Sequence, residues 1–214
     1  VDPELVGNGT RFLVSEMSGR STIELKAEQL GLELDGQVLS DVVETLKQLE
    51  YAGYHFEAAD ASLELLMRAA SGWVQDFFEL ESFSVNVGHR SGSGSRAWNE
   101  VAVDVETEAT VKVHVAGARV VTTGEGNGPV NALDAALRKA LDARYPQLER
   151  LHLTDFKVRV LETRQGTGAV TRVLIDTTNG EQTWTTIGVS ENIIEASWQA
   201  LVDSLVYGLL HTGT

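Results

Sequence analysis

Apolar residues recur at helical spacing through the first third of the chain, which predicts helices there. The clearest case is GQVLSDVVETLKQLEYAGY, in which Gly53 is expected to end the helix. Four apolar residues share one side of this helix: Val38, Val42, Leu46 and Leu49. A helix before it is predicted with Ser21 as N-cap, Glu24 completing a capping box and Gly31 as the stop. ADASLELLMRAAS predicts a third helix that ends near Gly72. No glycine-rich linker separates the three, so we expect one small helical unit that needs a surface to pack on.

From about residue 79 the spacing of apolar positions changes to two, which is typical of strands with one buried face. ELESFSVNVG alternates first and EVAVDVETEATVKVHVAG second. ARVVTTGEG predicts a third strand, before a helix over about 128–144. Six valines of the second segment share one parity: Val101, Val103, Val105, Val111, Val113 and Val115. SGSGS, at 91–95, predicts a flexible loop between the first two strands.

The same order of elements then occurs again. LTDFKVRVLET, GAVTRVLIDTTNG and EQTWTTIGVS are expected to be strands, and ENIIEASWQALVDSLVYGLL a long helix. The ends of the two halves also match, because each has a Thr-Thr pair, then Gly126 or Gly188, then a helix in the same register. The matching helix residues are Ala132, Ala136, Leu137 and Leu141 with Ala196, Ala200, Leu201 and Leu205. The two glycines are closer together in sequence than the matched helix residues are, which predicts a small insertion.

This repeat predicts an α+β fold in which two βββα units, about 80–146 and 151–210, are related by a pseudo-two-fold axis. Residues 1–75 are expected to form a helical region, and residues 76–214 the duplicated domain. Each unit would bury one sheet face under its helix and leave surface for a second chain. The seam between the units is a place for a ligand.

Composition narrows the classes of partner. With 17 Lys and Arg against 31 Asp and Glu, the formal net charge is −14, the opposite of the basic footprint of a nucleic-acid or anionic-membrane binder. No run of 18 apolar residues predicts a membrane span, and VDPELVGNGT has no signal-peptide pattern. The start without Met indicates a fragment or a processed chain. The chain has no cysteine, which removes disulfides and thiolate chemistry and fits a cytoplasmic protein.

GEGNGPVNALDAALRKAL, at 124–141, is the most distinctive stretch. Gly124, Gly126 and Gly128 permit close backbone approach or positive φ, and Pro129 suits a first helical turn. The free N–H groups of a helix start attract a carboxylate or phosphate, although a tight strand-to-helix turn needs the same residues. The spacing fits neither a dinucleotide-binding fingerprint nor a Walker loop. Both interpretations, an anion site and a plain turn, stay open.

Other motifs that carry chemistry are scarce. The histidines have no metal-ligand spacing: His55, His89, His114, His152 and His211. No G-x-S-x-G supports a serine hydrolase. Asp155 precedes the strand FKVRV, where its carboxylate is placed to meet an ammonium group. Tyr51, Tyr54 and Phe56 cluster at a helix end, which indicates either packing or a surface that docks another domain.

Five stretches together resemble the 2-isopropylmalate synthase family, over residues 5–210. They are RFLVSEMSGRSTI, LEYAGYHFEAADASLELLMR, EGNGPVNALDAALRKAL, LTDFKVRVL and GVSENIIEASWQALVDSLVYGLL. GNGPVNALDAALRKAL by itself is similar only to the regulatory domain of this family. GYHFEAADAS and SENIIEASWQALVDSL favour the citramalate branch of the family.

Enzymes of this family have a (β/α)₈ barrel that condenses acetyl-CoA with a 2-oxo acid and carries the divalent metal and the catalytic base. No stretch here resembles that barrel, so the resemblance implies no catalytic residue, no metal ligand and no cofactor in this chain. It implies that the first ~75 residues are the linker after the barrel, and that residues from about 80 are a dimeric regulatory domain. The implied ligand is a branched-chain amino acid, which is isoleucine in the citramalate branch and leucine in the isopropylmalate branch.

Resemblance and position together assign candidate effector-binding residues. The residues that match the family's motif are Gly126, Asn127, Gly128, Val130 and Asn131. Those assigned by position in the second unit are Leu151, Asp155, Val158, Val170, Ser190, Asn192 and Ile193. Communication with the barrel is implied for Ser18, Gly19, Arg20 and Tyr54. GVSEN lacks the Gly-Pro pair of the first turn, which leaves open whether each chain has one effector site or two.

Two other functions compete with an effector-binding role. A ligand-free dimerisation scaffold would have a filled, rigid seam between the units. A complete enzyme would need a catalytic constellation, and the sequence contains none.

Overall fold

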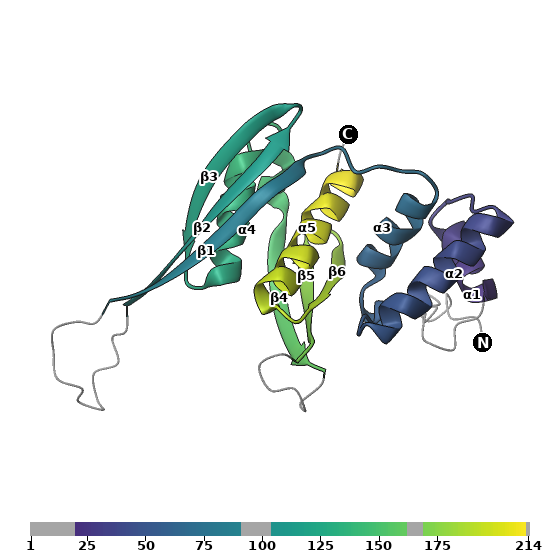
Figure 1. Cartoon of the computed structure of the whole chain (residues 1–214). Helices are drawn as coiled ribbons and strands as arrows, with labels where there is room; N and C mark the ends of the chain where they lie inside the picture. The colour runs from purple at the N-terminus through teal and green to yellow at the C-terminus, as the bar shows by residue number, and fades with distance from the viewer. Residues whose placement is uncertain (1–19, 91–103, 162–168, 213–214) are drawn as a thin grey trace.

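The first helices form a group at one end of the molecule (Figure 1). In the computed structural model, which describes residues 20–90, 104–161 and 169–212, they are α1 (Arg20–Gln29), α2 (Gly36–Tyr51), the 3-10 helix η2 (Phe56–Ala58) and α3 (Asp60–Ala70). The expected ends of the three α-helices are confirmed, because Gly31, Gly53 and Gly72 all have positive φ. In these positions a residue with a Cβ would be strained.

The start of α1 differs from the prediction. The helix already includes Arg20, so Ser21 lies inside its first turn and is not the N-cap. Arg20 fixes this extra residue, because its guanidinium donates a hydrogen bond to Ser40 Oγ of α2 at 2.9 Å. The side-chain cap belongs to α2 instead, where Asp35 accepts two backbone N–H groups at 2.8–2.9 Å. The buried side of α2 is Leu39, Val42 and Leu46, with Val38 and Leu49 half-buried at its margin.

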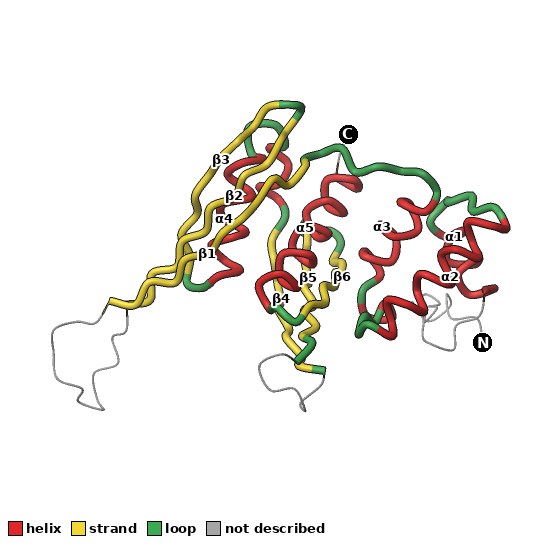
Figure 2. The backbone as a smooth tube through the Cα atoms, in the orientation of Figure 1, coloured by secondary structure: helices red, strands yellow, loops and turns green. Residues whose placement is uncertain are grey.

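The predicted order of three strands and a helix occurs twice, which confirms the α+β class and the duplicated βββα architecture (Figure 2). The first unit comprises β1 (Glu79–Arg90), β2 (Asp104–Val115), β3 (Ala118–Gly126) and α4 (Pro129–Leu141). After the 3-10 helix η3 (Pro146–Arg150), the second comprises β4 (His152–Val160), β5 (Thr171–Thr178), β6 (Thr183–Ser190) and α5 (Ile193–Thr212). Each sheet is antiparallel, in the orders β1-β2-β3 and β4-β5-β6. The loop predicted at 91–95 and the positions of Val101 and Val103 lie outside the described residues.

The third strands and helices of the two units match without any shift in register, so the expected small insertion is wrong. Thr122 Oγ1 donates to the carbonyl of Ala136 at 2.7 Å, and Thr186 Oγ1 donates to that of Ala200 at the same distance. The glycine equivalent to Gly188 is therefore Gly124 and not Gly126. Both glycines exist for the same reason, since a Cβ on either would lie under 3.0 Å from backbone atoms of the helix.

The first strands of the units also match, with Leu80 as the counterpart of Leu153. β1 has a bulge between Leu80 and Ser82, and β4 has one between Leu153 and Asp155. A bulge at the same place in both sheets supports the duplication independently of residue identity. It also sets which β4 side chains share the face of Leu153.

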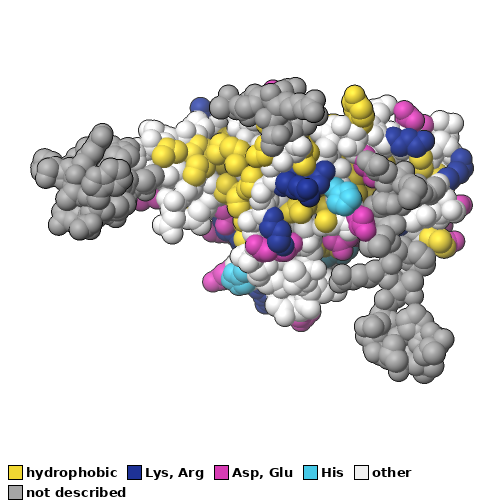
Figure 3. Space-filling view, turned by 90° about the horizontal axis from the view of Figure 1, so that it is seen from below, with side chains coloured by type: hydrophobic (Ala, Val, Ile, Leu, Met, Phe, Trp, Pro, Cys, Tyr) yellow, Lys and Arg dark blue, Asp and Glu magenta, His cyan; other side chains and the backbone are white. Residues whose placement is uncertain are grey.

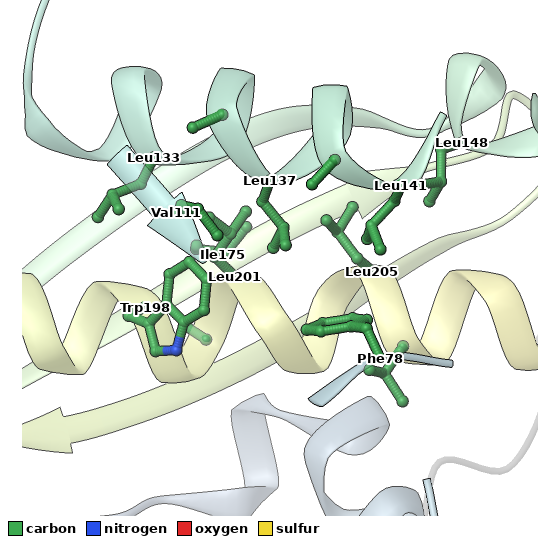
Figure 4. Close-up of a cluster of buried hydrophobic side chains, with 14 of the residues drawn as sticks. Phe78, Val111, Leu133, Leu137, Leu141, Leu148, Ile175, Trp198, Leu201 and Leu205 are labelled. Atoms are coloured by element: carbon green, nitrogen blue, oxygen red, sulfur yellow. The ribbon is translucent and has the colours of Figure 1, made fainter. Parts of the chain in front are cut away.

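The core of the duplicated domain lies where the two helices meet. α4 packs on β2 and β3, α5 packs on β5 and β6, and the two helices contact each other. In Figure 4, leucines of α4 point towards Leu201 and Leu205 of α5. The fully buried leucines of α4 and η3 are Leu133, Leu137, Leu141 and Leu148. α3 joins this assembly by packing on α5 and β6, so the helices at the N-terminal end share a core with the second unit.

Candidate regulatory site between the two units

A pocket of about 830 Å³ lies between α4 of the first unit and the η3–β4 segment that opens the second. We call it the α4 pocket. Its size falls within the range of small-molecule sites. The residues that line it are Val130, Asn131, Asp134, Arg138, Asp142, Pro146, Leu148, Glu149, Leu151, His152, Leu153 and Phe156. The pocket therefore occupies the seam between units that the sequence pointed to.

The glycine run leads directly into the pocket. Gly128 is the extended N-cap of α4 and Pro129 its first residue, so the next backbone N–H groups have no partner within the helix. Asn127 N–H donates to Asn131 Oδ1 at 3.2 Å, which folds the turn back on the helix. Gly126 permits this closure, because a Cβ there would lie 2.5 Å from Asn131 Oδ1. The helix start presents Val130 and Asn131 to the cavity.

An ion pair forms the polar side of the α4 pocket. Arg138 Nε lies 2.8 Å from Asp134 Oδ1, and Arg138 Nη1 donates to the carbonyl of Leu148 at 2.8 Å. Arg138 thus holds η3 against α4. Burial raises the pKa of the Asp134 carboxyl, and the neighbouring Arg138 opposes that rise only in part. A desolvated carboxylate beside a helix start is well suited to bind an ammonium group, since charge pairs are stronger where water is excluded.

The opposite side of the pocket is apolar. Leu148 and Leu151 are almost fully buried, and Leu153 is half-buried. Phe156 lies beyond them on β4 with 41% of its surface exposed. An aliphatic side chain would find contacts on this wall, while the ion pair of Asp134 and Arg138 lies on α4.

The sequence-based site residues fall into three groups in the structure. Val130, Asn131 and Leu151 line the α4 pocket. Gly126, Asn127 and Gly128 form the turn at its entrance. The remaining candidates do not line it: Asp155, Val158, Val170, Ser190, Asn192 and Ile193.

Asp155 and Val170 lie away from the α4 pocket for different reasons. Asp155 faces the other side of the sheet, where its Oδ2 lies 2.7 Å from Lys157 Nζ of the same strand. The hydrogen bond from Lys157 lowers the pKa of this exposed carboxyl. Val170 lies near Gly53, at the junction with the helices. Val158 is 42% exposed on the same face of β4 as Phe156.

Ser190 ends β6, and Asn192 and Ile193 form the start of α5, which is the counterpart of the α4 start. Asn192 takes the place of Gly128, and its Oδ1 accepts the N–H of Ile194 at 2.9 Å. The side chain of Asn192 therefore satisfies a backbone group that is left free at α4. The helix start of α5 is occupied by its own cap.

Most residues that line the pocket, including its ion pair and its aromatic ring, were not predicted as site residues from the sequence. These are Asp134, Arg138, Asp142, Pro146, Leu148, Glu149, His152, Leu153 and Phe156. One signal was available: Asp134 and Arg138 have the i, i+4 spacing of an ion pair and flank the apolar stripe of the helix. Nothing in the sequence indicated that η3 would close over that flank.

An aromatic stack fills the inner part of the counterpart of this seam in the other unit. Asp134 corresponds to Trp198 of α5, and Phe156 corresponds to Phe83 of β1. Trp198 and Phe83 stack with ring centroids 4.8 Å apart. The tryptophan therefore occupies the space that remains open beside Asp134, and this breaks the pseudo-two-fold symmetry of the domain.

The expected communication residues are only partly described. Ser18 and Gly19 lie outside the described residues. Arg20 ties α1 to α2 through Ser40. Tyr54 stacks on Phe56 and donates a hydrogen bond from its hydroxyl to Gln199 Oε1 of α5 at 3.1 Å. Tyr54 thus joins the end of α2 to the second unit.

Two other features, a metal-binding group and a membrane-spanning helix, are not found among the described residues. No group of three or more His, Asp or Glu in ranges 20–90, 104–161 and 169–212 is placed to hold a metal ion. Over the same ranges, none of the helices has the length and apolar character needed to span a bilayer.

A duplicated βββα domain with a pocket between its two units is the structural class of this protein. Comparison of the sequence with known families identifies the family. The family model described as LeuA allosteric (dimerisation) domain matches residues 57–209, which is more than half of the chain. The chain belongs to this family.

The most informative relatives are bacterial enzymes named (R)-citramalate synthase. The one from Streptomyces coelicolor is 52% identical over 216 residues, and the alignment covers 100% of this chain and 39% of the relative. The relatives from Synechocystis sp. and Aquifex aeolicus are 48% and 45% identical, and each alignment covers 98% of this chain and 38% of the relative. The chain thus spans less than two fifths of the length of these relatives.

Proposed function

We propose that this chain is the feedback-regulatory and dimerisation region of an acetyl-CoA-dependent citramalate synthase, and that it binds a branched-chain amino acid, isoleucine, in the α4 pocket. The catalytic barrel, its divalent metal and acetyl-CoA would belong to a part of the enzyme outside this sequence. The observation that carries the proposal is the α4 pocket itself, in a chain of an allosteric domain family whose relatives are citramalate synthases.

The chemistry of the pocket suits an amino-acid zwitterion. The ammonium group binds Asp134, whose carboxylate is buried and lies on the pocket side of α4. The carboxylate binds the free N–H groups at the start of α4, beside Asn131. An aliphatic side chain then lies on the wall of Leu151, Leu153 and Phe156.

The broken symmetry supports one effector site per chain. The stack of Trp198 on Phe83 fills the inner part of the equivalent seam of the other unit, and the start of α5 is capped by Asn192. Trp198 takes the place of Asp134 there, and the free helix start of α4 is not repeated. A dimer would therefore bind two amino acids.

Dimerisation is supported by apolar surface that no described helix of this chain covers. α5 packs on β5 and β6, so the helix-side residues of β4 stay exposed: Phe156 at 41%, Val158 at 42% and Val160 at 51%. Seen from below, hydrophobic side chains gather in a band in the left half of the molecule (Figure 3). Exposed apolar patches of this kind mark protein–protein interfaces. Because Phe156 also lines the α4 pocket, a second copy seated here would lie beside the effector.

The test is calorimetric titration of the 214-residue chain with L-isoleucine, L-leucine and L-valine. We expect saturable binding of isoleucine with one site per chain, and much weaker binding of leucine and valine. Asp134→Asn should weaken the affinity for isoleucine by about tenfold or more, because it removes the charge that pairs with the ammonium group. Asp203→Asn, which alters a carboxylate outside this pocket, is the matched control.

Three results would change the proposal. Preference for leucine would place the chain in the isopropylmalate branch. Equal loss of affinity in both variants would remove the α4 pocket as the site. Absence of binding to a folded dimer, repeated on the enzyme with its barrel, would leave a dimerisation scaffold.

A further inference from the structure

A second pocket, of about 600 Å³, lies between α3 and α5. We call it the α5 pocket. Apolar and aromatic residues form most of its wall: Leu49, Phe56, Leu65, Leu66, Ala69, Trp73, Ile187, Trp198, Val202 and Val206. The polar residues that line it are Tyr54, Ser62, Gln75, Glu195, Gln199 and Asp203. It joins the helices at the N-terminal end to the duplicated domain.

The α5 pocket is the pseudo-symmetric counterpart of the α4 pocket. In the register that pairs Ala136 with Ala200, lining residues of α4 and its C-cap have lining residues of α5 as counterparts. Asn131, Asp134, Arg138 and Asp142 correspond to Glu195, Trp198, Val202 and Val206. In the register of the first strands, Pro146 and Leu148 become Trp73 and Gln75. Trp198 fills the inner part of this counterpart, and α3 closes what remains. The duplication has thus left two pockets, and their charges differ.

Asp203 is the group that gives the α5 pocket its chemistry. Its Oδ2 accepts a hydrogen bond from Ser62 Oγ at 2.6 Å. The described residues provide no ion-pair partner for it, and the lining contains no Lys, Arg or His. Burial raises the pKa of Asp203 to about 6, which shows how poorly its charge is solvated. A cation placed in the pocket would relieve that cost.

The remaining polar groups also favour a cation. Glu195 adds a second carboxylate to the lining. Gln199 Oε1 accepts from Tyr54 Oη and from the N–H of Val189, both at 3.1 Å, so this amide is held in place. Trp73, Trp198 and Tyr54 supply aromatic rings, which attract ammonium groups. The lining contains no cationic side chain that could bind the carboxylate of a ligand.

We propose that the α5 pocket is a second ligand site, which takes an alkylammonium group: the cation binds Asp203 and the alkyl stem lies among Trp73, Val202 and Leu66. This ligand class differs from the zwitterion of the α4 pocket. Two sources have the same chemistry, a free alkylamine and a lysine side chain of a polypeptide. In either case the ligand would bridge α3 and α5.

The test uses n-pentylamine, n-pentanol and n-pentanoate, which share a stem and differ in charge. Binding to the 214-residue chain is followed through the indole N–H signals of Trp73 and Trp198 in NMR titrations. We expect pentylamine to bind at least about tenfold more tightly than pentanol, and pentanoate not to bind. Asp203→Asn should abolish the preference for the amine, whereas Asp134→Asn, in the α4 pocket, should leave it unchanged.

Equal affinities for pentylamine and pentanol, or a preference that survives Asp203→Asn, would overturn the proposal. Trp73→Ala is a second variant at a half-buried position outside the helices, and it should weaken amine binding while the chain stays folded. Nα-acetyl-L-lysine amide distinguishes the sources, because binding of this probe supports a lysine side chain and binding of pentylamine alone supports a free amine. Binding of isoleucine to the α4 pocket is measured separately, so either proposal can fail without the other.

Discussion

One glycine in each unit, Gly124 in β3 and Gly188 in β6, lets the helix of that unit lie against the strand. Both glycines face equivalent backbone atoms of the helix. A Cβ on Gly188 would lie 1.9 Å from the carbonyl oxygen of Ala196, and a Cβ on Gly124 would lie 2.4 Å from Ala136 N. Both contacts are with backbone atoms, which cannot move aside as a flexible side chain can. Gly128, in the same run, has no atom within 4 Å of the position of a Cβ. Close packing explains Gly124, whereas Gly128 leaves the start of α4 without a side chain.

Gly188→Ala should therefore destabilise the chain strongly. We expect the free energy of unfolding to fall by about 3 kcal/mol or more, because α5 must move away from β6. Gly128→Ala is the matched control, and it should change stability little because its φ of −176° is ordinary extended backbone. Urea unfolding followed by circular dichroism measures both. Similar losses in the two variants would show that the close approach of helix and strand is not the cause.

Asp203→Asn should stabilise the chain at neutral pH. Because burial raises the pKa of Asp203 from 3.8 to about 6, the ionised carboxylate disfavours the folded state. That cost is absent below about pH 4, develops as the pH rises towards 6, and is constant above it. The free energy of unfolding of the variant minus that of the parent should be about 2 kcal/mol larger at pH 7.5 than at pH 4. Tyr54 and Glu195 are the other titratable groups of the lining, and both are unchanged in the variant.

The comparison is made by urea unfolding at the two pH values. A difference between variant and parent that does not vary with pH would contradict the burial of an unpaired charge. Ser62→Ala cannot serve as a control here, because its hydroxyl contacts Asp203 directly.

For individual residues, the sequence predicted some of the positions that line the α4 pocket, but not the role that each side chain has there. Val130, Asn131 and Leu151 do line the α4 pocket, because the helix start and the strand start were both predicted. The roles of Asp134 and Trp198 were not predictable. They depend on which residues meet across the seam, and the sequence pattern pairs Gly188 with Gly126 where the structure pairs it with Gly124.

At the scale of elements, β6 shows how the exposed edge of a sheet is protected. The backbone N–H groups of alternate residues along this edge are each bound by a side chain. Thr185 N–H donates to Asp60 Oδ1 at 3.5 Å, and Ile187 N–H donates to Ser62 Oγ at 3.1 Å. The N–H of Val189 donates to Gln199. α3 and α5 thus cover the edge with side chains in place of another strand.

Ser62→Ala should weaken the docking of α3 on β6. The substitution leaves the buried N–H of Ile187 without its acceptor and removes the donor to Asp203. We expect a loss of about 2–3 kcal/mol in unfolding free energy. Ser71→Ala is the control, because Ser71 Oγ bonds only the carbonyl of Arg68 at the end of the same helix. Hydrogen exchange of the β6 amides should increase in Ser62→Ala alone, and equal protection in both variants would contradict this account of the edge.

The elements themselves were predictable because each has a clear period. Alternation in β2 and β5 and the apolar stripe of α4 gave the right type of element in the right order. The start of α1 was wrong, since a tertiary contact of Arg20 with α2 outweighed the local capping signal at Ser21. The protection of the β6 edge was not visible in the sequence, because it joins residues 125 positions apart.

At the scale of the whole molecule, the apolar face of β4 points to a second copy. Phe156, Val158 and Val160 occupy the helix side of the strand, where the first unit places Phe83 against Trp198. In the second unit no tryptophan of the described residues covers them. A partner chain would bury this surface and close the open side of the α4 pocket.

Val158→Lys should therefore break the dimer without unfolding the chain. Burying a lysine in an apolar interface is costly, whereas the free strand already exposes 42% of this side chain. We expect a shift from dimer to monomer in sedimentation velocity and an unchanged circular dichroism spectrum. Val121→Lys, at a position of β3 that is 48% exposed and faces away from α4, is the control. A dimer that survives Val158→Lys would place the interface on another surface.

Binding of an amino acid between α4 and β4 can be seen directly in a crystal structure of the chain grown with saturating L-isoleucine. We expect density for one isoleucine per chain, with its ammonium group at Asp134 and its side chain against Leu151 and Phe156. An isoleucine bound at the start of α5, beside Val170 or in the α5 pocket, with the α4 pocket holding only water, would contradict that expectation.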